Sequence, residues 1–457
     1  MTEPQLRALG PALSRFLEDY LFCCGYTQTF AHLGTYVRGL LSDLPRKSVE
    51  PMALQAGTPV RTLQEFLKDH HWDFAAVRDQ LHRHVGVLLP TLPADDLGAV
   101  GLVDETSTVK QGTKTPGVKR QYLGCVGKVE NGIVTVHLGV CQGPYKALLD
   151  ADLYLPEDWA ADRRRCREAG IPDDVVYRPK WQIALEQRDR ARASGVRLDW
   201  LTFDEEYGKR PGFVAGLDTR AQRFGGEVPR SFSCLAAHRS GRRPDARLKG
   251  RVAEEVVRVS SSFRRQPWQV LRLARQTLAD QVWRVKAARV WLSSAAGWSA
   301  ATYWLLWASN DATGEEKFFL SNAPAEAPVE RLVRVAFRRA GVEHSFRVCK
   351  SELGFSHFEG RSYPALLRHL GLCLVALAFV AEHTQHLRGE KCRGDDGAGV
   401  PGAARAEPGL AAAAATHQRA GLCPGDHRVP PDPQPRRPAV QAKTRSHRPV
   451  SEKATAA

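Results

Sequence analysis

Apolar residues near the start of the chain recur at three- and four-residue steps. This set comprises Phe16, Tyr20, Cys23, Tyr26 and Phe30. Such spacing is typical of the buried face of an amphipathic helix, and Gly25 within the set could divide it into two helices. Residues 1–92 are therefore predicted to form a helical N-terminal domain. It would end at a linker, residues 90–96, which is marked by two prolines and two aspartates.

A second pattern within this region has the spacing of a helix-turn-helix. Its members are Val49, Ala53, Gly57, Leu63 and Phe66. A small residue would pack the first helix, the glycine would form the turn, and the apolar residues would seat the second helix. Arg61 and Lys68 would then lie on an exposed face that could contact DNA. An ordinary helical bundle without base contacts explains the pattern equally well.

The next region, residues 97–235, begins with apolar, β-rich segments. Strands are predicted at Ala99–Val103, at Gln121–Val129 and at Ile133–Val140, with a turn at Glu130–Gly132. The first of these strands ends next to Asp104. Together they would form a sheet platform.

The same region continues with a charged helical stretch, residues 157–195, and a mostly apolar strand at Val196–Phe203. This strand ends at Asp204. The residues after it are predicted to be loop because of three closely spaced glycines, Gly208, Gly212 and Gly216.

The pattern changes again further along the chain. Residues 236–325 hold short aromatic strands and many tryptophans, which predicts a β-rich insertion. Residues 326–384 return to helical spacing. Residues 385–457 contain no Phe, Tyr, Trp, Ile or Met, and they are rich in Pro, Gly and Ala. Such a basic, low-complexity tail cannot bury enough apolar surface to offset the entropy of ordering it, so we expect it to be disordered.

Charge and hydrophobicity narrow the class of protein. The 457 residues carry a formal net charge of +15, which favours a polyanionic partner such as nucleic acid. No run of 18 apolar residues is present, so no membrane association is expected. The first residues lack a basic stretch followed by an apolar segment, which predicts a cytoplasmic protein.

Three carboxylates on separate segments are the candidate chemistry: Asp104, Asp204 and Glu343. Converging carboxylates suit a pair of hard divalent cations, which prefer oxygen ligands. Arg339 and Lys350 lie four residues before and seven residues after Glu343, so all three side chains would share one face of a helix. By spacing alone, a surface helix with ordinary charge pairs is the simpler explanation.

The segment Val342–Tyr363 resembles the C-terminal signature of insertion-sequence transposases with a DDE catalytic domain. The branch in question carries the motif Tyr-x2-Arg-x3-Glu-x6-Lys. Arg339, Glu343 and Lys350 occupy its last three positions, whereas Ala336 stands where the tyrosine is expected. Two further stretches are similar to the regions around the family's first and second aspartates. These stretches are Leu102–Thr106 with Gly117–Asn131, and Leu201–Gly208.

The resemblance implies an α+β fold with a ribonuclease-H-like mixed-sheet catalytic core, formed by residues 97–235 and 326–384. It also implies two divalent metal ions, Mg²⁺ or alternatively Mn²⁺, held by Asp104, Asp204 and Glu343. Arg339 and Lys350 would contact DNA phosphates, and Lys128 and Arg361 are further candidates for DNA contact. The implied activity is cleavage at the ends of the element and strand transfer into target DNA.

Such a protein would bind double-stranded DNA as a homodimer or in a larger synaptic complex, in the cytoplasm of a bacterium and associated with the nucleoid. Two alternatives remain open. One is a decayed transposase that binds DNA without cutting it, and the other is a different ribonuclease-H-like DNA nuclease.

Overall fold

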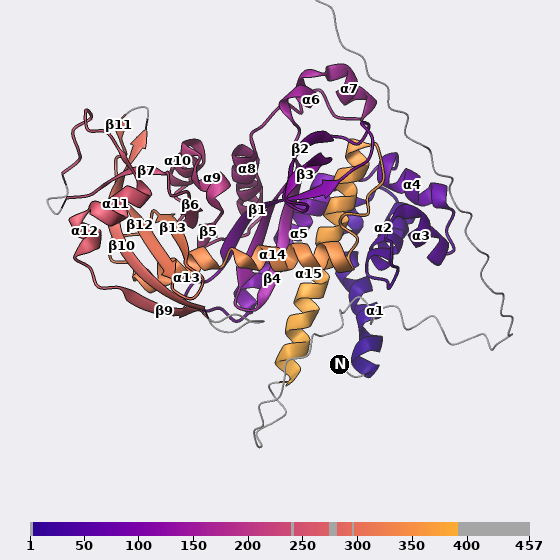
Figure 1. Ribbon diagram of the computed structural model, residues 1–457. Coiled ribbons are helices and arrows are strands. Elements are labelled where there is room, and N and C mark those ends of the chain that lie inside the picture. The colour runs from indigo at the N-terminus through magenta and orange to yellow at the C-terminus, as the bar shows by residue number, and fades with distance from the viewer. Residues whose placement is uncertain (1–2, 239–241, 274–280, 295–296, 392–457) are drawn as a thin grey trace, which may run out of the picture. The chain divides into compact units, whose positions relative to one another are not determined.

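The computed structural model describes residues 3–238, 242–273, 281–294 and 297–391. Within these ranges the chain combines helices with two β-sheets, which is an α+β architecture (Figure 1). Most of the predicted tail, residues 392–457, lies outside the described residues.

Helices occupy the N-terminal part of the chain. They are α1 (Glu3–Glu18), α2 (Thr27–Leu40), α3 (Val49–Gln55), α4 (Val60–Lys68) and α5 (Phe74–Leu88), with 3-10 turns at Leu21–Cys23 and Leu89–Thr91. Asp73 caps α5, because its side chain accepts hydrogen bonds from the N–H groups of Ala75 and Ala76. The predicted helix-turn-helix spacing coincides with the consecutive helices α3 and α4. Binding of DNA by this pair stays a prediction.

The first sheet is built on β1. Its strands are β1 (Val100–Val109), β2 (Lys119–Leu123), β3 (Lys128–Gln142), β4 (Tyr145–Leu153) and β5 (Trp200–Thr202). β3 pairs antiparallel with β1, β2 and β4, whereas β5 pairs parallel with β1. A further parallel bridge joins Leu201 to Phe224. The sheet therefore contains an antiparallel meander, with β5 added in parallel beside β1 and the segment at Phe224 added beside β5.

The turn between β2 and β3 differs from the sequence prediction. Glu130–Gly132 lies inside β3, and the chain turns instead before it, where Gly127 has a φ of +66°. Gly132 does not form a turn. It allows β3 to approach β1 closely, because a Cβ there would lie 2.4 Å from the carbonyl oxygen of Thr108. The predicted turn was wrong because a glycine can mark either situation.

Helices follow the first sheet: α6 (Glu157–Ala161), α7 (Arg163–Glu168), α8 (Lys180–Ala193), α9 (Glu205–Gly208) and α10 (Pro211–Thr219). The loop predicted after Asp204 was wrong, because α9 and α10 occupy it. Gly212 and Gly216 let α10 pack closely on α8. A Cβ on Gly216 would lie 2.4 Å from Leu185, and one on Gly212 would lie 3.0 Å from Trp181.

The second sheet combines strands from residues 236–325, the predicted insertion, with two strands that begin before residue 236. Its strands are β6 (Gly225–Val228), β7 (Ser233–Ala236), β8 (Arg251–Val252), β9 (Gln269–Leu273), β10 (Gln281–Ser294), β11 (Gly297–Trp298), β12 (Tyr303–Asn310) and β13 (Glu315–Ser321). The strand order is β6-β13-β12-β10-β7-β8, with β9 and β11 also paired to β10. Two short helices, α11 (Ala253–Val259) and α12 (Ser261–Arg264), accompany it.

Three helices close the described chain: α13 (Val329–Phe337), α14 (Ala340–Glu352) and α15 (Tyr363–Lys391). α14 packs against β1, β3 and β4, and α15 packs against β4, α2, α4 and α5 (Figure 1). Residues 363–385 of α15 are long and apolar enough to cross a membrane. However, 78% of an apolar 18-residue window within them is buried inside the protein. α15 is thus a core helix. α14, which contacts α15, packs on the sheet and brings Glu343 next to it.

Candidate active site

Two neighbouring strands place Asp104 and Asp204 side by side. β1 and β5 pair in parallel with a constant offset, so that Val100 faces Trp200 and Leu102 faces Thr202. Asp104 lies two residues beyond Leu102 on β1, and Asp204 lies two residues beyond Thr202, the last residue of β5. The charge of Asp204 acts on the pKa of Asp104, so the two carboxylates are close together. Asp104 is only 8% exposed. The register of the sheet, and not either segment alone, therefore creates the pair.

Asp204 stands where β5 gives way to a helix. Its side chain caps α9 by accepting hydrogen bonds from the N–H groups of Glu206, at 3.0 Å, and Tyr207, at 3.4 Å. These bonds use one carboxylate oxygen, Oδ1, and fix the orientation of the group. Among the described residues no hydrogen bond to the other oxygen, Oδ2, is found, so this oxygen can bind a ligand at the end of the strand.

Glu343 and Arg339 bring α14 to the two aspartates. The Arg339 guanidinium donates to Oδ2 of Asp104 at 2.9 Å and to Oε1 of Glu343 at 3.3 Å. Glu343 itself is exposed. The charges of all three predicted carboxylates act on Arg339. From the sequence, this arginine was expected to contact DNA phosphates. A contact between Arg339 and DNA stays a prediction.

The site holds more negative charge than one guanidinium compensates. Burial raises the pKa of Asp104 to about 7; Arg339 opposes this rise, and the nearby Asp204 adds to it. Burial likewise raises the pKa of Asp204 to about 6, again against Arg339 and with a contribution from Glu105. Both aspartates would therefore be stabilised in their charged form by an additional cation.

Lys350 lies on the same face of α14 as Glu343. Its Nζ atom donates to the carbonyl oxygen of Ser107 on β1 at 3.4 Å, and burial lowers its pKa. A cavity of about 310 Å³ opens here between α14 and the strands β1 and β2. Glu343, Lys350 and Glu105 line it. This cavity offers space for a substrate group beside the third carboxylate.

Three further residues, Glu105, Lys180 and Tyr207, contribute to the electrostatics of the site. They were not identified from the sequence. Glu105 forms an ion pair with Lys180 at 2.7 Å, and its other oxygen is buried without a hydrogen-bond partner in the described part of the chain. Tyr207 is buried close by, and its pKa is raised by burial and by Glu105. No sequence signal identifies Lys180, because its approach to β1 depends on the fold of α8.

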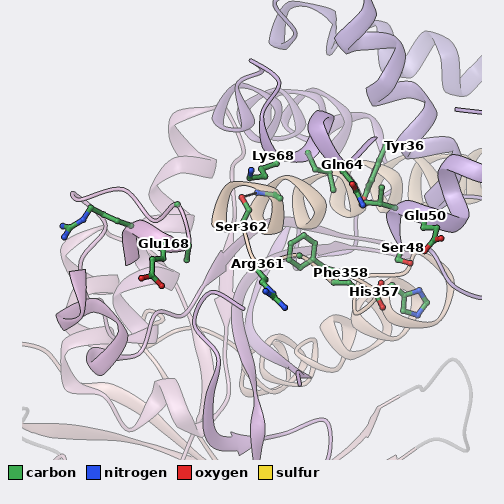
Figure 2. A pocket seen from close by; sticks show the side chains of 18 residues that line it. Tyr36, Ser48, Glu50, Gln64, Lys68, Glu168, His357, Phe358, Arg361 and Ser362 are labelled. Atoms are coloured by element: carbon green, nitrogen blue, oxygen red, sulfur yellow. Dashed lines mark hydrogen bonds between the residues drawn. The ribbon is translucent and has the colours of Figure 1, made fainter. Parts of the chain in front are cut away.

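The remaining predicted DNA contacts are spread over the surface. Arg61 pairs with Glu65 at 2.6 Å, and Lys128 pairs with Glu130 at 3.4 Å. Lys68 and Arg361, far apart in the sequence, line one cavity of about 630 Å³ (Figure 2). The structure therefore brings together Lys68 and Arg361, while Arg61 and Lys128 lie outside that cavity.

The carboxylates around Arg339 are the candidate ligands for a metal ion. In the described ranges no three His, Cys, Asp or Glu side chains are grouped closely enough to hold an ion as they stand. The Arg339 guanidinium occupies the position between Asp104 and Glu343. The chemistry of the donors nevertheless fits Mg²⁺ or Mn²⁺, because all are carboxylates, and the buried Asp104 and the half-buried Asp204 have raised pKa values.

Comparisons with known proteins found similarity to two transposases. A curated relative, the probable transposase for insertion sequence element IS701 of Microchaete diplosiphon, is 30% identical over 223 residues. The match covers 47% of this chain and 53% of the relative, so the chain spans about half the length of that protein. The cryo-EM structure of the piggyBac transposase synaptic complex with hairpin DNA is 10% identical. It covers 80% of this chain and 68% of that chain, with a TM-score of 0.39.

A family profile also matches the greater part of the chain. The profile describes DDE superfamily endonucleases and matches residues 20–291. This range contains Asp104 and Asp204 and ends before Glu343. Since it spans more than half of the 457 residues, the chain belongs to the DDE superfamily endonucleases.

Proposed function

We propose that this protein is a transposase that binds the ends of an insertion sequence, cleaves phosphodiester bonds there and joins the freed ends to target DNA. The observation that carries the proposal is the placement of Asp104 and Asp204 side by side, with Glu343 reached through a shared arginine. The family membership and the insertion-sequence relative support the same activity.

The first sheet supports a ribonuclease-H-like core. β1, β3 and β4 form an antiparallel meander, β5 adds in parallel next to β1, and the segment at Phe224 adds in parallel next to β5. Asp104 lies on the opening strand, Asp204 follows the first parallel strand, and Glu343 lies on a helix packed on the sheet. This arrangement of three carboxylates matches the one implied by the sequence resemblance.

Asp104, Asp204 and Glu343 are the residues that would hold two divalent ions. When bound, such ions activate the attacking oxygen and stabilise the leaving oxygen of an in-line displacement at phosphorus. The chain's own part is to keep Asp104 rigid on β1 and to orient Asp204 through its capping hydrogen bonds. Glu343, on the exposed side of α14, can adjust its side chain toward them.

Arg339 and Lys350 are proposed to bind the phosphates on either side of the scissile bond. Both are partly buried cations next to the carboxylates, at 2.9 Å from Asp104 and 3.4 Å from the Ser107 carbonyl. A phosphate that bound Arg339 would draw the guanidinium away from Asp104 and Glu343 and free these carboxylates. The same cations would position the backbone for attack.

The partner is proposed to be double-stranded DNA, both as element ends and as target. The net charge of +15 favours such a polyanion. Action on paired ends would require a homodimer or a larger synaptic complex. In a bacterium this places the protein on the nucleoid.

The decisive experiment is cleavage of a labelled duplex that carries the element's own ends, with Mg²⁺ and with EDTA. Metal-dependent cutting at the ends is expected, and Glu343→Gln should reduce it about 1,000-fold or more. Glu330→Gln is the matched control, because Glu330 is an exposed acid on the neighbouring helix α13. It should cut at the rate of the unmodified protein.

Two other results would replace the proposal. Binding of the ends without cutting by the unmodified protein would identify a decayed transposase that only binds DNA. Cutting that persists in Glu343→Gln would remove Glu343 from the active site and point to a different ribonuclease-H-like nuclease.

A further inference from the structure

Two neighbouring cavities form a groove away from the carboxylates. The first, about 630 Å³, lies between α4, the end of α7 and the segment that precedes α15. The second, about 690 Å³, lies between α6, α7 and the loop that follows β1. Glu168, Ala169 and Arg361 line both cavities. The two are therefore continuous, and Figure 2 shows Lys68 and Arg361 in the first of them.

Six cations and four acids line this groove, so its walls carry a net positive charge. Lys68 and Arg167 line the first cavity, Lys114, Arg164 and Arg165 line the second, and Arg361 lines both. Lys114 and Arg164 share a single acid, Glu168, at 3.6 and 3.1 Å. Arg167 and Arg361 are exposed, and neither has an ion-pair partner among the described residues. The groove thus presents two uncompensated guanidinium groups to a ligand.

β1 connects the groove to the carboxylates through a series of cations. Arg339 contacts the strand at Asp104, and Lys350 contacts it at Ser107. Lys110, just beyond the strand, donates to the carbonyl oxygen of Phe358, a residue that lines the groove. At about 3.3 Å per residue, these contacts are about 10 Å apart, and the groove begins about 20 Å from Asp104.

We propose that this groove binds the backbone of the duplex that flanks the cleavage site, with Arg167 and Arg361 contacting phosphates. The inference rests on the proposed function. Successive base pairs are about 3.4 Å apart, so a distance of about 20 Å corresponds to about six base pairs from the scissile phosphate. A line of cations at regular intervals suits the regular charge of a DNA strand better than an isolated anion.

The test measures binding of the full chain to a fluorescent 30-base-pair duplex as a function of salt. Arg167→Ala with Arg361→Ala should weaken binding and lower the slope of log K against log salt by about 2, one for each lost phosphate contact. Arg192→Ala is the control. Arg192 is exposed at the end of α8, has no ion-pair partner in the described ranges and lines neither cavity. It should leave the slope unchanged.

A second readout locates the contact. Ethylation of individual phosphates in a duplex carrying the element's end should interfere with binding about six base pairs from the cut, and this interference should vanish in the double variant. Unchanged thermal melting of the variant would confirm that it folds. If the double variant binds DNA as tightly as the unmodified protein, the proposed role of the groove is wrong, whereas the proposed function is unaffected. A failure of the unmodified protein to bind any duplex would overturn the proposed function itself.

Discussion

At the scale of single residues, Arg339 is the most informative position of the site. Spacing on the helix placed it next to Glu343, and the fold adds Asp104 as its second partner. Its guanidinium is the cation that compensates Asp104 and Asp204, whose pKa values remain raised in spite of it. The arginine thus serves the stability of the site as well as any contact with phosphate.

The ion pair between Arg339 and Asp104 can be measured with a double-mutant cycle in EDTA. Arg339→Gln leaves a buried carboxylate without its cation, so it should destabilise the protein more than it does in the Asp104→Asn background. The expected coupling free energy is about 1–3 kcal/mol, obtained from urea unfolding. A cycle of Arg339→Gln with Glu330→Gln should be additive. Additive effects for Arg339 and Asp104 would show that the pair contributes nothing.

At the scale of elements, the sequence predicted helices and strands best where apolar spacing was regular. It did not predict that β1 continues through Asp104 to Val109, or that Glu130–Gly132 lies within a strand. β5 is also shorter than the predicted strand, at Trp200–Thr202. The reason is that glycine and polar residues are compatible with both turns and strands. Whether they lie in a strand depends on pairing with residues far along the chain.

Gly132 provides a test of this explanation. A Cβ at this position would lie 2.4 Å from the Thr108 carbonyl oxygen and 2.5 Å from Leu123, so β1 and β3 would have to separate. Gly132→Ala should lower the free energy of unfolding by about 1–3 kcal/mol. Gly124→Ala, in the loop between β2 and β3, meets no heavy atom within 4 Å and should be nearly neutral. Equal effects of the two substitutions in chemical denaturation would contradict the assigned role of Gly132.

At the scale of the whole described chain, α15 joins the N-terminal helices to the catalytic sheet. Arg368 donates to the carbonyl oxygens of Leu67, His70 and Trp72, and the rings of Phe16 and Phe379 lie 5.5 Å apart. Residues separated by about 300 positions thus share one core. The sequence predicted a separate domain at 1–92, and only these contacts show how closely its helices are bound to α15.

His369 lies at the centre of this shared core. It is fully buried on α15; its Nδ1 forms a hydrogen bond of 2.8 Å with the Tyr36 hydroxyl of α2, and its Nε2 donates to the Phe355 carbonyl at 3.3 Å. Burial lowers its pKa to about 4, and the nearby cations Lys110 and His357 act in the same direction. The folded protein therefore holds a neutral imidazole.

This neutral histidine predicts a loss of stability in acid. In the unfolded chain the imidazole binds a proton below a pH of about 6.5, whereas the folded state resists protonation down to about 4. The free energy of unfolding contributed by His369 should thus be complete above pH 6.5 and fall by about 3 kcal/mol as the pH approaches 4.

His369→Gln keeps the hydrogen-bonding groups without the titration, so its unfolding free energy should decline less steeply between pH 6.5 and 4. Urea unfolding across this range measures the difference, with the exposed His71→Gln as control. Parallel pH profiles for the His369 variant and the unmodified protein would exclude His369 as the acid-sensitive contact between α2 and α15.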